Sequence, residues 1–242
     1  MEILGLRIVA ISDLHGDTIP TDTLPDGDVL VIAGDVLVDD FYPPGRDSTG
    51  TSRVQRQGWF FDDVWVPWLR TLTSKYSRVL WIGGNHDFFL DAMRIGSTIY
   101  DSMPEGVTYL NEELISIDGV LFYGAPWNMT EGWAFAIDES DYMTKLAYVP
   151  DDTDVLITHG PPANVNMPGF HYCSSVLAEW IRNRPDLKVV ICGHIHEAYG
   201  TYRVGAAQIH VVSSKDRNYR MVNAPVIIDL PTAVKEPIVD AN

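Results

Sequence analysis

The stretch that decides the fold is Gly83-Gly84-Asn85-His86-Asp87. It follows an apolar run, Val79-Leu80-Trp81-Ile82, which indicates a buried strand. The two glycines allow the chain to turn sharply where that strand ends. An amide, an imidazole and a carboxylate then follow one another, and these groups bind divalent metal ions or move protons. A polar turn would explain this stretch taken alone, so the argument for a site rests on its recurrence.

An apolar strand followed by a turn with metal-binding residue types occurs at four further places. The residues are Asp13 and His15 after the strand expected at 6–12, Asp35 after 28–33, His159 after 155–157, and His194 and His196 after 189–192. Binding sites of open α/β sheets form where loops leave the carboxyl ends of strands. We therefore expect the five turns to converge on one site.

The residue types in these turns suit a pair of divalent ions, because they offer carboxylate, amide and imidazole groups and no thiolate. Two ions about 3.5–4 Å apart can share a hydroxide and stabilise a phosphoryl group during its transfer. A bridging ligand is expected to use two donor atoms, and Asp35 is the natural candidate. Asp13 and His15 are two residues apart, so they would share a face of an extended strand, as would His194 and His196.

The rest of the chain mixes strand–helix units with hairpins, which predicts an α/β fold with mixed sheets covered by helices. Asp118-Gly119 is typical of a hairpin turn, and Pro67 must lie near the start of its helix or kink it. Helices are expected at 59–76, 88–95, 133–147 and 174–183. Further strands are expected at 107–110, 113–118, 120–124, 207–213 and 226–230. The remaining segments are a long loop at 39–58, a second loop at 126–132 and a short tail at 231–242.

Composition narrows the function classes. The 242 residues suffice for one large domain, and we expect a single domain over 1–242. The net charge of −16 repels polyanions, so we expect no duplex DNA partner. Two cysteines do not make a disulfide framework. No apolar run approaches the length of a membrane span and the N-terminus carries no leader pattern, so we expect a cytoplasmic protein without a membrane partner.

Together the five motifs resemble those of the calcineurin-like metallophosphoesterases. They are Asp13-x-His15, Gly34-Asp35, Gly84-Asn85-His86-Asp87, His159-Gly160 and Gly193-His194-x-His196, in the order of the family. The resemblance spans residues 13–196, most of the chain. It implies a four-layer αββα sandwich of two mixed sheets flanked by helices, with a dinuclear metal site in loops at the carboxyl ends of strands.

The resemblance also implies roles for the motif residues. His86 would protonate the leaving oxygen or hold the phosphate, and Asp87 would support the turn. Mn²⁺ is the first choice of metal, with Fe, Zn, Co and Ni as alternatives. One ion would be held by Asp13, His15, Asp35 and His196, and the other by Asp35, Asn85, His159 and His194.

Within the family, the chain resembles the branch of small metallophosphoesterase-domain-containing phosphodiesterases. The resemblance is carried by Thr158-His159-Gly160-Pro161-Pro162 and by residues 194–200 and 223–230. Protein phosphatases of the family place Asp-Arg after Gly-Asp, whereas this chain has Val36-Leu37-Val38-Asp39-Asp40. The resemblance and the acidic charge favour a small phosphodiester, such as a 2′,3′-cyclic nucleotide, attacked by a metal-bridging hydroxide.

Other substrates and another class of function stay open at this point. The same chemistry fits a nucleotide phosphomonoesterase, a single-strand nuclease or, less well, a phosphoprotein phosphatase. A metal-stabilised binding or scaffold protein with vestigial activity is the alternative of another class. Asn128 is a further residue that could reach the cleft. The expected substrate contacts are Asn85, His86, Arg53 and His171, and Arg46 and Arg56 are further candidates for a phosphate grip.

Overall fold

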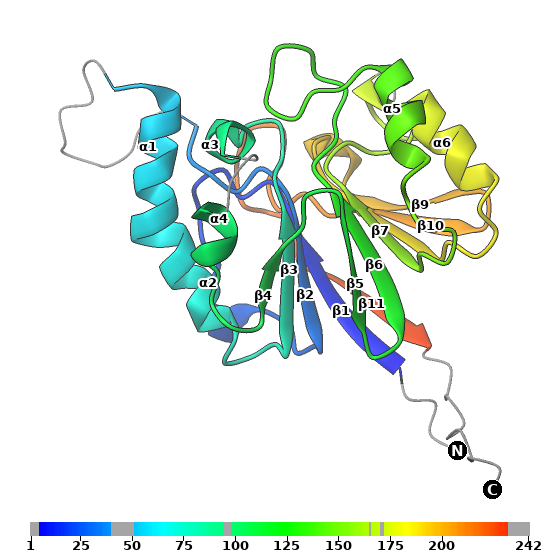
Figure 1. Ribbon diagram of the computed structural model, residues 1–242. Helices are drawn as coiled ribbons and strands as arrows, with labels where there is room; N and C mark the ends of the chain where they lie inside the picture. Colours follow the sequence, from blue (N-terminus) through cyan, green and yellow to red (C-terminus); the bar gives the residue numbers. More distant parts are fainter. Residues whose placement is uncertain (1–4, 40–50, 94–97, 165, 170–171, 232–242) are drawn as a thin grey trace, which may run out of the picture.

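The computed structural model describes residues 5–39, 51–93, 98–164, 166–169 and 172–231 (Figure 1). Two β-sheets pack face to face, and helices cover both outer faces (Figure 1). This arrangement confirms the expected αββα sandwich. None of the helices in the described part of the chain has the length and apolar character that are needed to span a bilayer.

The first sheet has the strand order β11-β1-β2-β3-β4. β1 to β4 are parallel to one another, and β11 pairs antiparallel with β1. Every residue of β2 is buried, as expected for a central strand that is covered on both faces. The strands are β1 (Gly5–Ile11), β2 (Val29–Ala33), β3 (Arg78–Ile82), β4 (Val107–Tyr109) and β11 (Val226–Pro231).

The second sheet has the order β5-β6-β7-β8-β10-β9. Its first hairpin turns at Asp118-Gly119, whose φ angles of 48° and 82° confirm the expected turn. The edge strand β9 was not predicted, because its residues alternate between exposed and partly buried and include Gly, Thr and Arg. The strands are β5 (Glu113–Ile117), β6 (Val120–Ala125), β7 (Val155–Thr158), β8 (Val189–Cys192), β9 (Gly200–Val204) and β10 (Ala207–Val211).

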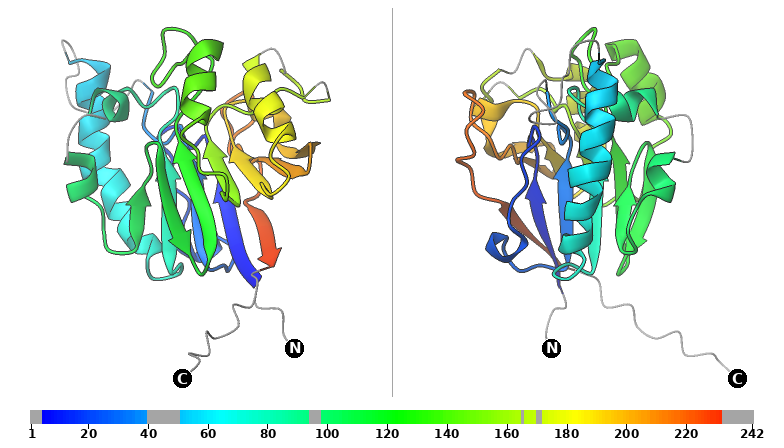
Figure 2. Two further views of the ribbon diagram at one scale, coloured as in Figure 1. Left: turned by 45° about the vertical axis from the view of Figure 1, so that its right-hand side comes forward. Right: turned by 90° about the vertical axis from the view of Figure 1, so that its left-hand side faces the viewer.

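The helices divide between the two outer faces. α1, a π-helical turn and α2 form one long rod beside the first sheet, and α5 and α6 cover the second (Figures 1 and 2). The helices are α1 (Arg53–Phe60), the π turn (Phe61–Trp65), α2 (Val66–Leu72), α3 (Phe88–Ala92), α4 (Thr98–Asp101), α5 (Glu139–Leu146) and α6 (Ser175–Arg182), with short 3₁₀ turns at Thr21–Thr23 and His196–Ala198.

Two expectations about helices are wrong. Residues 53–58 form the start of α1 and not a loop, because Ser52 and Gln55 make a capping box that begins the helix there. The rest of that predicted loop, 40–50, lies outside the described residues. The segment 133–138 is not helical, because its backbone bonds to other loops: Ala134 donates its N–H to the carbonyl of Asn85. α5 begins only after Asp138, which caps it.

Pro67 lies near the start of α2, which is one of the two places expected for it. Pro67 follows the π turn, and it lies in the first turn of α2, where a missing N–H costs least. The helix ends at Leu72, four residues before the predicted end.

The core between the sheets aligns the site. Successive residues of a strand point to opposite faces, so alternate residues of β1 and β2 meet the second sheet while the others meet the helices. The layer between the sheets includes Ile8, Ala10, Val29, Val31, Leu80, Ile82, Phe122, Ile157 and Ile191. The sheets join at one edge, where Ser12 donates its N–H to Val212 and accepts from that of Ser214. This edge holds the carboxyl ends of β1, β2, β3, β7 and β8.

We predict that Gly84→Ala lowers the free energy of unfolding by about 3 kcal/mol, because a Cβ at this position would collide with the backbone nitrogen and carboxylate of Asp35. The control is Gly132→Ala, where φ is +79° but a Cβ would have no neighbour within 4 Å, so about 1 kcal/mol is expected. Urea unfolding followed by tryptophan fluorescence in EDTA measures both without a contribution from metal. Equal losses in the two variants would contradict the close packing of Gly84 against Asp35.

Candidate metal centre

The turns that carry the site are built from strained backbone. Asp13, His15, Asp35 and His194 have φ angles of 54°, 43°, 52° and 69°, in the left-handed region that residues other than glycine seldom adopt. These residues are therefore not in extended strands, so the condition under which pairs two apart would share a strand face is not met. Sharp turns bring the side chains together instead. Such strain is retained where the surrounding structure determines the conformation, often at functional sites.

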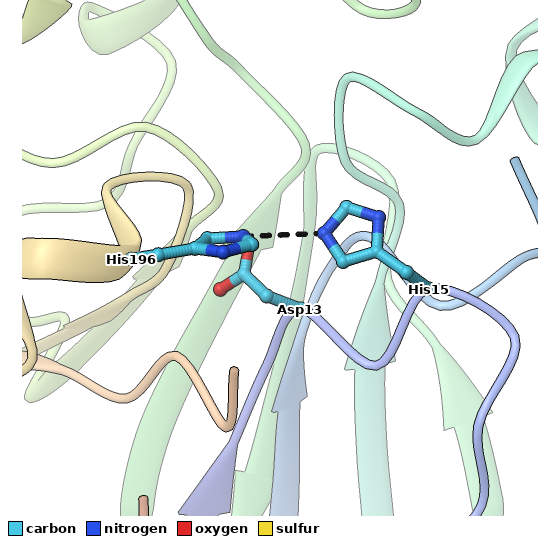
Figure 3. A group of neighbouring side chains, drawn as sticks. All are labelled: Asp13, His15 and His196. Atoms are coloured by element: carbon cyan, nitrogen blue, oxygen red, sulfur yellow. Dashed lines mark hydrogen bonds and ion pairs between the residues drawn. The ribbon is translucent and has the colours of Figure 1, made fainter. Parts of the chain in front are cut away.

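One group of side chains consists of Asp13, His15 and His196 (Figure 3). The Nε2 atoms of His15 and His196 are 3.2 Å apart, and Nε2 of His196 lies 3.5 Å from Oδ1 of Asp13. Donor atoms that surround an ion at about 2.0–2.2 Å lie roughly 3–3.5 Å from one another. The spacing of this group therefore fits one divalent ion.

A second group lies beside the first and consists of Asn85, His159 and His194. Oδ1 of Asn85 is 2.8 Å from Nε2 of His159 and 2.7 Å from Nδ1 of His194. These are hydrogen-bond distances, so an ion that enters this group would spread the donors by a few tenths of an ångström. The amide oxygen and the two imidazole nitrogens are suitable ligands for a second ion.

Asp35 lies between the two groups. Its Oδ2 atom is 3.7 Å from Nε2 of His15 and 3.3 Å from Nε2 of His159. Its other oxygen, Oδ1, accepts the backbone N–H of His86. The structure thus differs from the expectation of a bridge with two donor atoms, because a single oxygen faces both groups. A carboxylate oxygen has enough lone pairs for such a role.

Hydrogen bonds behind the imidazoles orient them. Nδ1 of His159 lies 2.9 Å from the carbonyl of Ala33, and Nδ1 of His196 lies 2.9 Å from that of Asp216, so both rings direct Nε2 into the site. His194 is reversed: its Nε2 lies 3.1 Å from the hydroxyl of Thr130, and its Nδ1 faces Asn85. Partners of this kind fix the orientation of metal-binding histidines and raise their basicity. Thr130 and Asp216 were not predicted.

Asp13 is oriented in the same way. Its Oδ2 accepts from the hydroxyls of Ser12 and Ser213, and both of its oxygens lie near the backbone N–H of His194. Oδ1 is left to face His196. The carboxylate is fully buried, so these contacts compensate part of its lost hydration. The donor set and its orientation fit a pair of divalent ions, and both cysteines of the chain are buried elsewhere as free thiols.

Charges within the metal-free cluster shift its pKa values strongly. Burial favours neutral imidazole, but Asp35 outweighs burial and raises the pKa of His159 to about 9. Asp13 in the same way raises the pKa of His196 to about 9. Burial and the charge of His159 lower the pKa of His194 to about 4. Protons on two imidazoles thus balance the two buried carboxylates when no metal is bound.

His86 stands next to this cluster, and a residue that the sequence reasoning missed holds it. Nδ1 of His86 is hydrogen-bonded to Oδ1 of Asp39, whose Oδ2 lies 3.3 Å from Nδ1 of His15. Burial lowers the pKa of His86, but the hydrogen bond to Asp39 and the charges of Asp35 and Asp39 outweigh burial and raise it. Asp39 acquires this role because its loop lies beside that of His86.

The loops around His86 are tied to one another. Asp87 accepts the backbone N–H groups of Val36, Leu37 and Gly84, at 2.7 to 3.3 Å. Gln57 of α1, also missed, donates to the carbonyls of Val38 and His86 and accepts from the N–H of Phe89. Asp87 and Gln57 are both fully buried, so each holds two loops in a fixed relation.

A pocket of about 220 Å³ opens over the cluster. It is lined by Asp35, Asn85, His86, His194, His196, Glu197, Arg217 and Tyr219, so it includes two of the expected substrate contacts and adds three residues that were not predicted. Arg53 does not line it: its guanidinium lies 4.7 Å from the ring centre of Phe88 and 5.8 Å from that of Trp133. His171 and Arg46 lie outside the described residues. Asn128 is buried and donates to the carbonyl of Ala134.

Comparisons with known proteins agree with this site. A family model described as calcineurin-like phosphoesterase matches residues 6–198, which include the five motifs. Metallophosphoesterase domain-containing protein 1 of Homo sapiens is 30% identical over 252 residues, covering 93% of this chain and 71% of the human protein, and that of Mus musculus matches equally. The crystal structure of TT1561 of Thermus thermophilus aligns with a TM-score of 0.54 at 16% identity, covering 86% of this chain and 89% of that chain, which supports the fold alone.

We predict that metal binding releases at least two protons per chain at pH 7.5. His159 and His196, each with a pKa near 9, must lose their protons before Nε2 can bind an ion, whereas His194 is already neutral. Metal affinity should therefore rise with pH up to about 9. Calorimetric titration with Mn²⁺ in buffers of different ionisation enthalpy measures the release, and a repeat at pH 9.5 should show much less of it. Heats that do not depend on the buffer at pH 7.5 would refute these protonation states.

Proposed function

We propose that this chain, which belongs to the calcineurin-like phosphoesterase family, is a dinuclear metal-dependent phosphodiesterase that acts on small phosphodiesters such as 2′,3′-cyclic nucleotides. Hydrolysis of phosphoester bonds is the reaction of the family. The observation that carries the proposal is the place of Asp35, whose Oδ2 faces two groups of metal-binding side chains while Oδ1 holds the backbone of His86.

The residues would hold two ions in the groups described above, with Mn²⁺ as our first choice. Two bound divalent ions would activate water as a nucleophile and neutralise charge on the phosphoryl oxygens. Asp13 and His196 are held by contacts on their far sides, so their donor atoms need little reorganisation. The hydroxyl of Thr130 holds the ring of His194 from its far side in the same way.

His86 is proposed to donate a proton to the leaving oxygen. It lines the pocket, and Asp39 occupies its Nδ1, which leaves Nε2 to exchange the proton. Asp39 also favours the protonated ring, which is the form that a general acid requires. Asp39 is a positioning residue in this account, because its contacts are with imidazoles.

Apart from the two proposed ions, Arg217 is the permanent positive charge among the described residues that line the pocket, which suits a diester better than a monoester. A phosphodiester carries one negative charge, whereas a phosphomonoester carries nearly two at neutral pH. Among the described residues that line the pocket, Asp35 and Glu197 are acidic and Arg217 has the permanent positive charge, and Asp39 adds a further carboxylate behind His86. The chain as a whole carries −16. The cytoplasmic location and the absence of duplex DNA and membrane partners stay predictions from the sequence.

The assay that tests this proposal compares matched aryl esters with the same leaving group. EDTA-treated protein that is reloaded with Mn²⁺ should hydrolyse bis(p-nitrophenyl) phosphate and 2′,3′-cyclic nucleotides with a kcat/KM at least tenfold above that for p-nitrophenyl phosphate. The unloaded protein is the control and should be inactive. A preference for the monoester would indicate a nucleotidase, and tight binding of two ions without turnover would favour the scaffold function.

His86→Asn distinguishes proton donation from phosphate holding. Loss of a general acid costs about 10²–10⁴-fold when the leaving group is basic. We expect the loss in kcat to be at least tenfold larger for methyl phenyl phosphate than for methyl p-nitrophenyl phosphate, because nitrophenolate leaves without protonation. Metal content, measured by elemental analysis, should be unchanged. An equal loss with both substrates would assign His86 to phosphate binding instead.

A further inference from the structure

The segment between β10 and β11 carries two side chains into the pocket, although none of the five motifs lies in it. Arg217 and Tyr219 line the pocket over the metal groups. The ring of Tyr219 lies edge-on against the imidazoles of His15 and His196, with centroids 4.7 and 5.1 Å away. Tyr219 is 47% exposed, so nearly half of its surface is open to solvent. A half-exposed aromatic ring is thus held beside the candidate metal groups.

The segment is held rigidly in this position. Lys215, which is 5% exposed, makes an ion pair of 2.8 Å with Asp17 of the first motif loop. The carbonyl of Asp216 lies 2.9 Å from Nδ1 of His196 and accepts the N–H of Tyr219 at 2.8 Å. The turn is therefore anchored to both sides of the first metal group.

The two arginines of this turn, Arg217 and Arg220, differ in their contacts. The carboxylate of Asp216 accepts the backbone N–H of Arg220 and pairs with its guanidinium at 2.6 Å. The guanidinium of Arg220 is therefore paired within the turn and stabilises it. Arg217 lines the pocket, and its side chain makes no hydrogen bond or ion pair with the other described residues. Its positive charge is available to a ligand.

The backbone of Tyr219 supports a role in binding. Its φ of +60° is in the left-handed region, which an aromatic residue adopts at a cost of about 1–3 kcal/mol. The turn would close at lower cost with asparagine or glycine at this position. The presence of a strained tyrosine at the mouth of the pocket is explained if its ring has a function there.

We propose that Arg217 and Tyr219 form the substrate-recognition element, with Arg217 pairing with a phosphoryl oxygen and Tyr219 stacking on a planar ring that the phosphodiester carries. The substrate class is thereby narrowed to phosphodiesters that carry an aromatic group, either an aryl ester or the base of a nucleotide. This inference rests on the proposed function, since it assigns the contacts of the same pocket.

The test measures inhibition of bis(p-nitrophenyl) phosphate hydrolysis by adenosine 5′-monophosphate and by inorganic phosphate, which differ in the nucleoside. Tyr219→Asn removes the ring and tolerates a positive φ. It should raise the Ki of the nucleotide about tenfold and leave that of phosphate unchanged, because stacking on a base is lost. Tyr219→Phe, which keeps the ring, should restore most of that affinity.

Arg217→Gln should raise the Ki of both inhibitors about tenfold, because a charge-assisted hydrogen bond to phosphate is lost. Arg70→Gln on α2 removes the same charge outside the pocket and is the matched control. Unchanged Ki values in Arg217→Gln, or a Tyr219→Asn effect that is equal for nucleotide and phosphate, would overturn the inference. A wild-type protein without diesterase activity would instead overturn the proposed function, so the two failures are distinguishable.

Discussion

The structure depends on the buried carboxylate of Asp35, whose negative charge must be stabilised by polar groups on several sides. It is 2% exposed, and an unpaired charge in such a place would be very costly. One oxygen accepts the N–H of His86, and the other faces imidazoles that come from different sheets. The close approach of the next loop leaves no space for a Cβ at Gly84. Gly84 therefore follows from the need to enclose this charge, whereas Gly83 leaves space for the ring of Phe135.

The site is also the joint between the two sheets. The first sheet supplies Asp13, His15, Asp35 and Asn85, and the second supplies His159, His194 and His196. Contacts that run across the joint, such as those of Ser213 and the N–H of His194 with Asp13, hold the loops in register. Because a ligand that binds the folded state stabilises it, ions at this joint would strengthen the packing of the sheets as well as provide the chemistry.

Much of the fold was predictable, because the buried strands are short apolar runs and each motif follows one. The convergence of five turns was predictable for the same reason. The conformation of the turns was not, since the left-handed φ of Asp13 and His194 is imposed by tertiary contacts. Asp39, Thr130, Arg217 and Tyr219 were missed because their roles depend on which loops lie side by side. The segment 133–138 was expected to be helical, whereas its backbone bonds are made with distant loops.

The buried charge of Asp35 supports a two-ion site, on which the proposed phosphodiesterase activity and the proposed role of His86 depend. The central claim is that the two groups hold a pair of ions bridged by Asp35. Electron paramagnetic resonance of the protein loaded with two equivalents of Mn²⁺ tests it most directly. The wild-type protein should give the spectrum of an exchange-coupled pair, and Asp35→Asn should give that of isolated ions. Isolated Mn²⁺ signals in the fully loaded wild-type protein would contradict it.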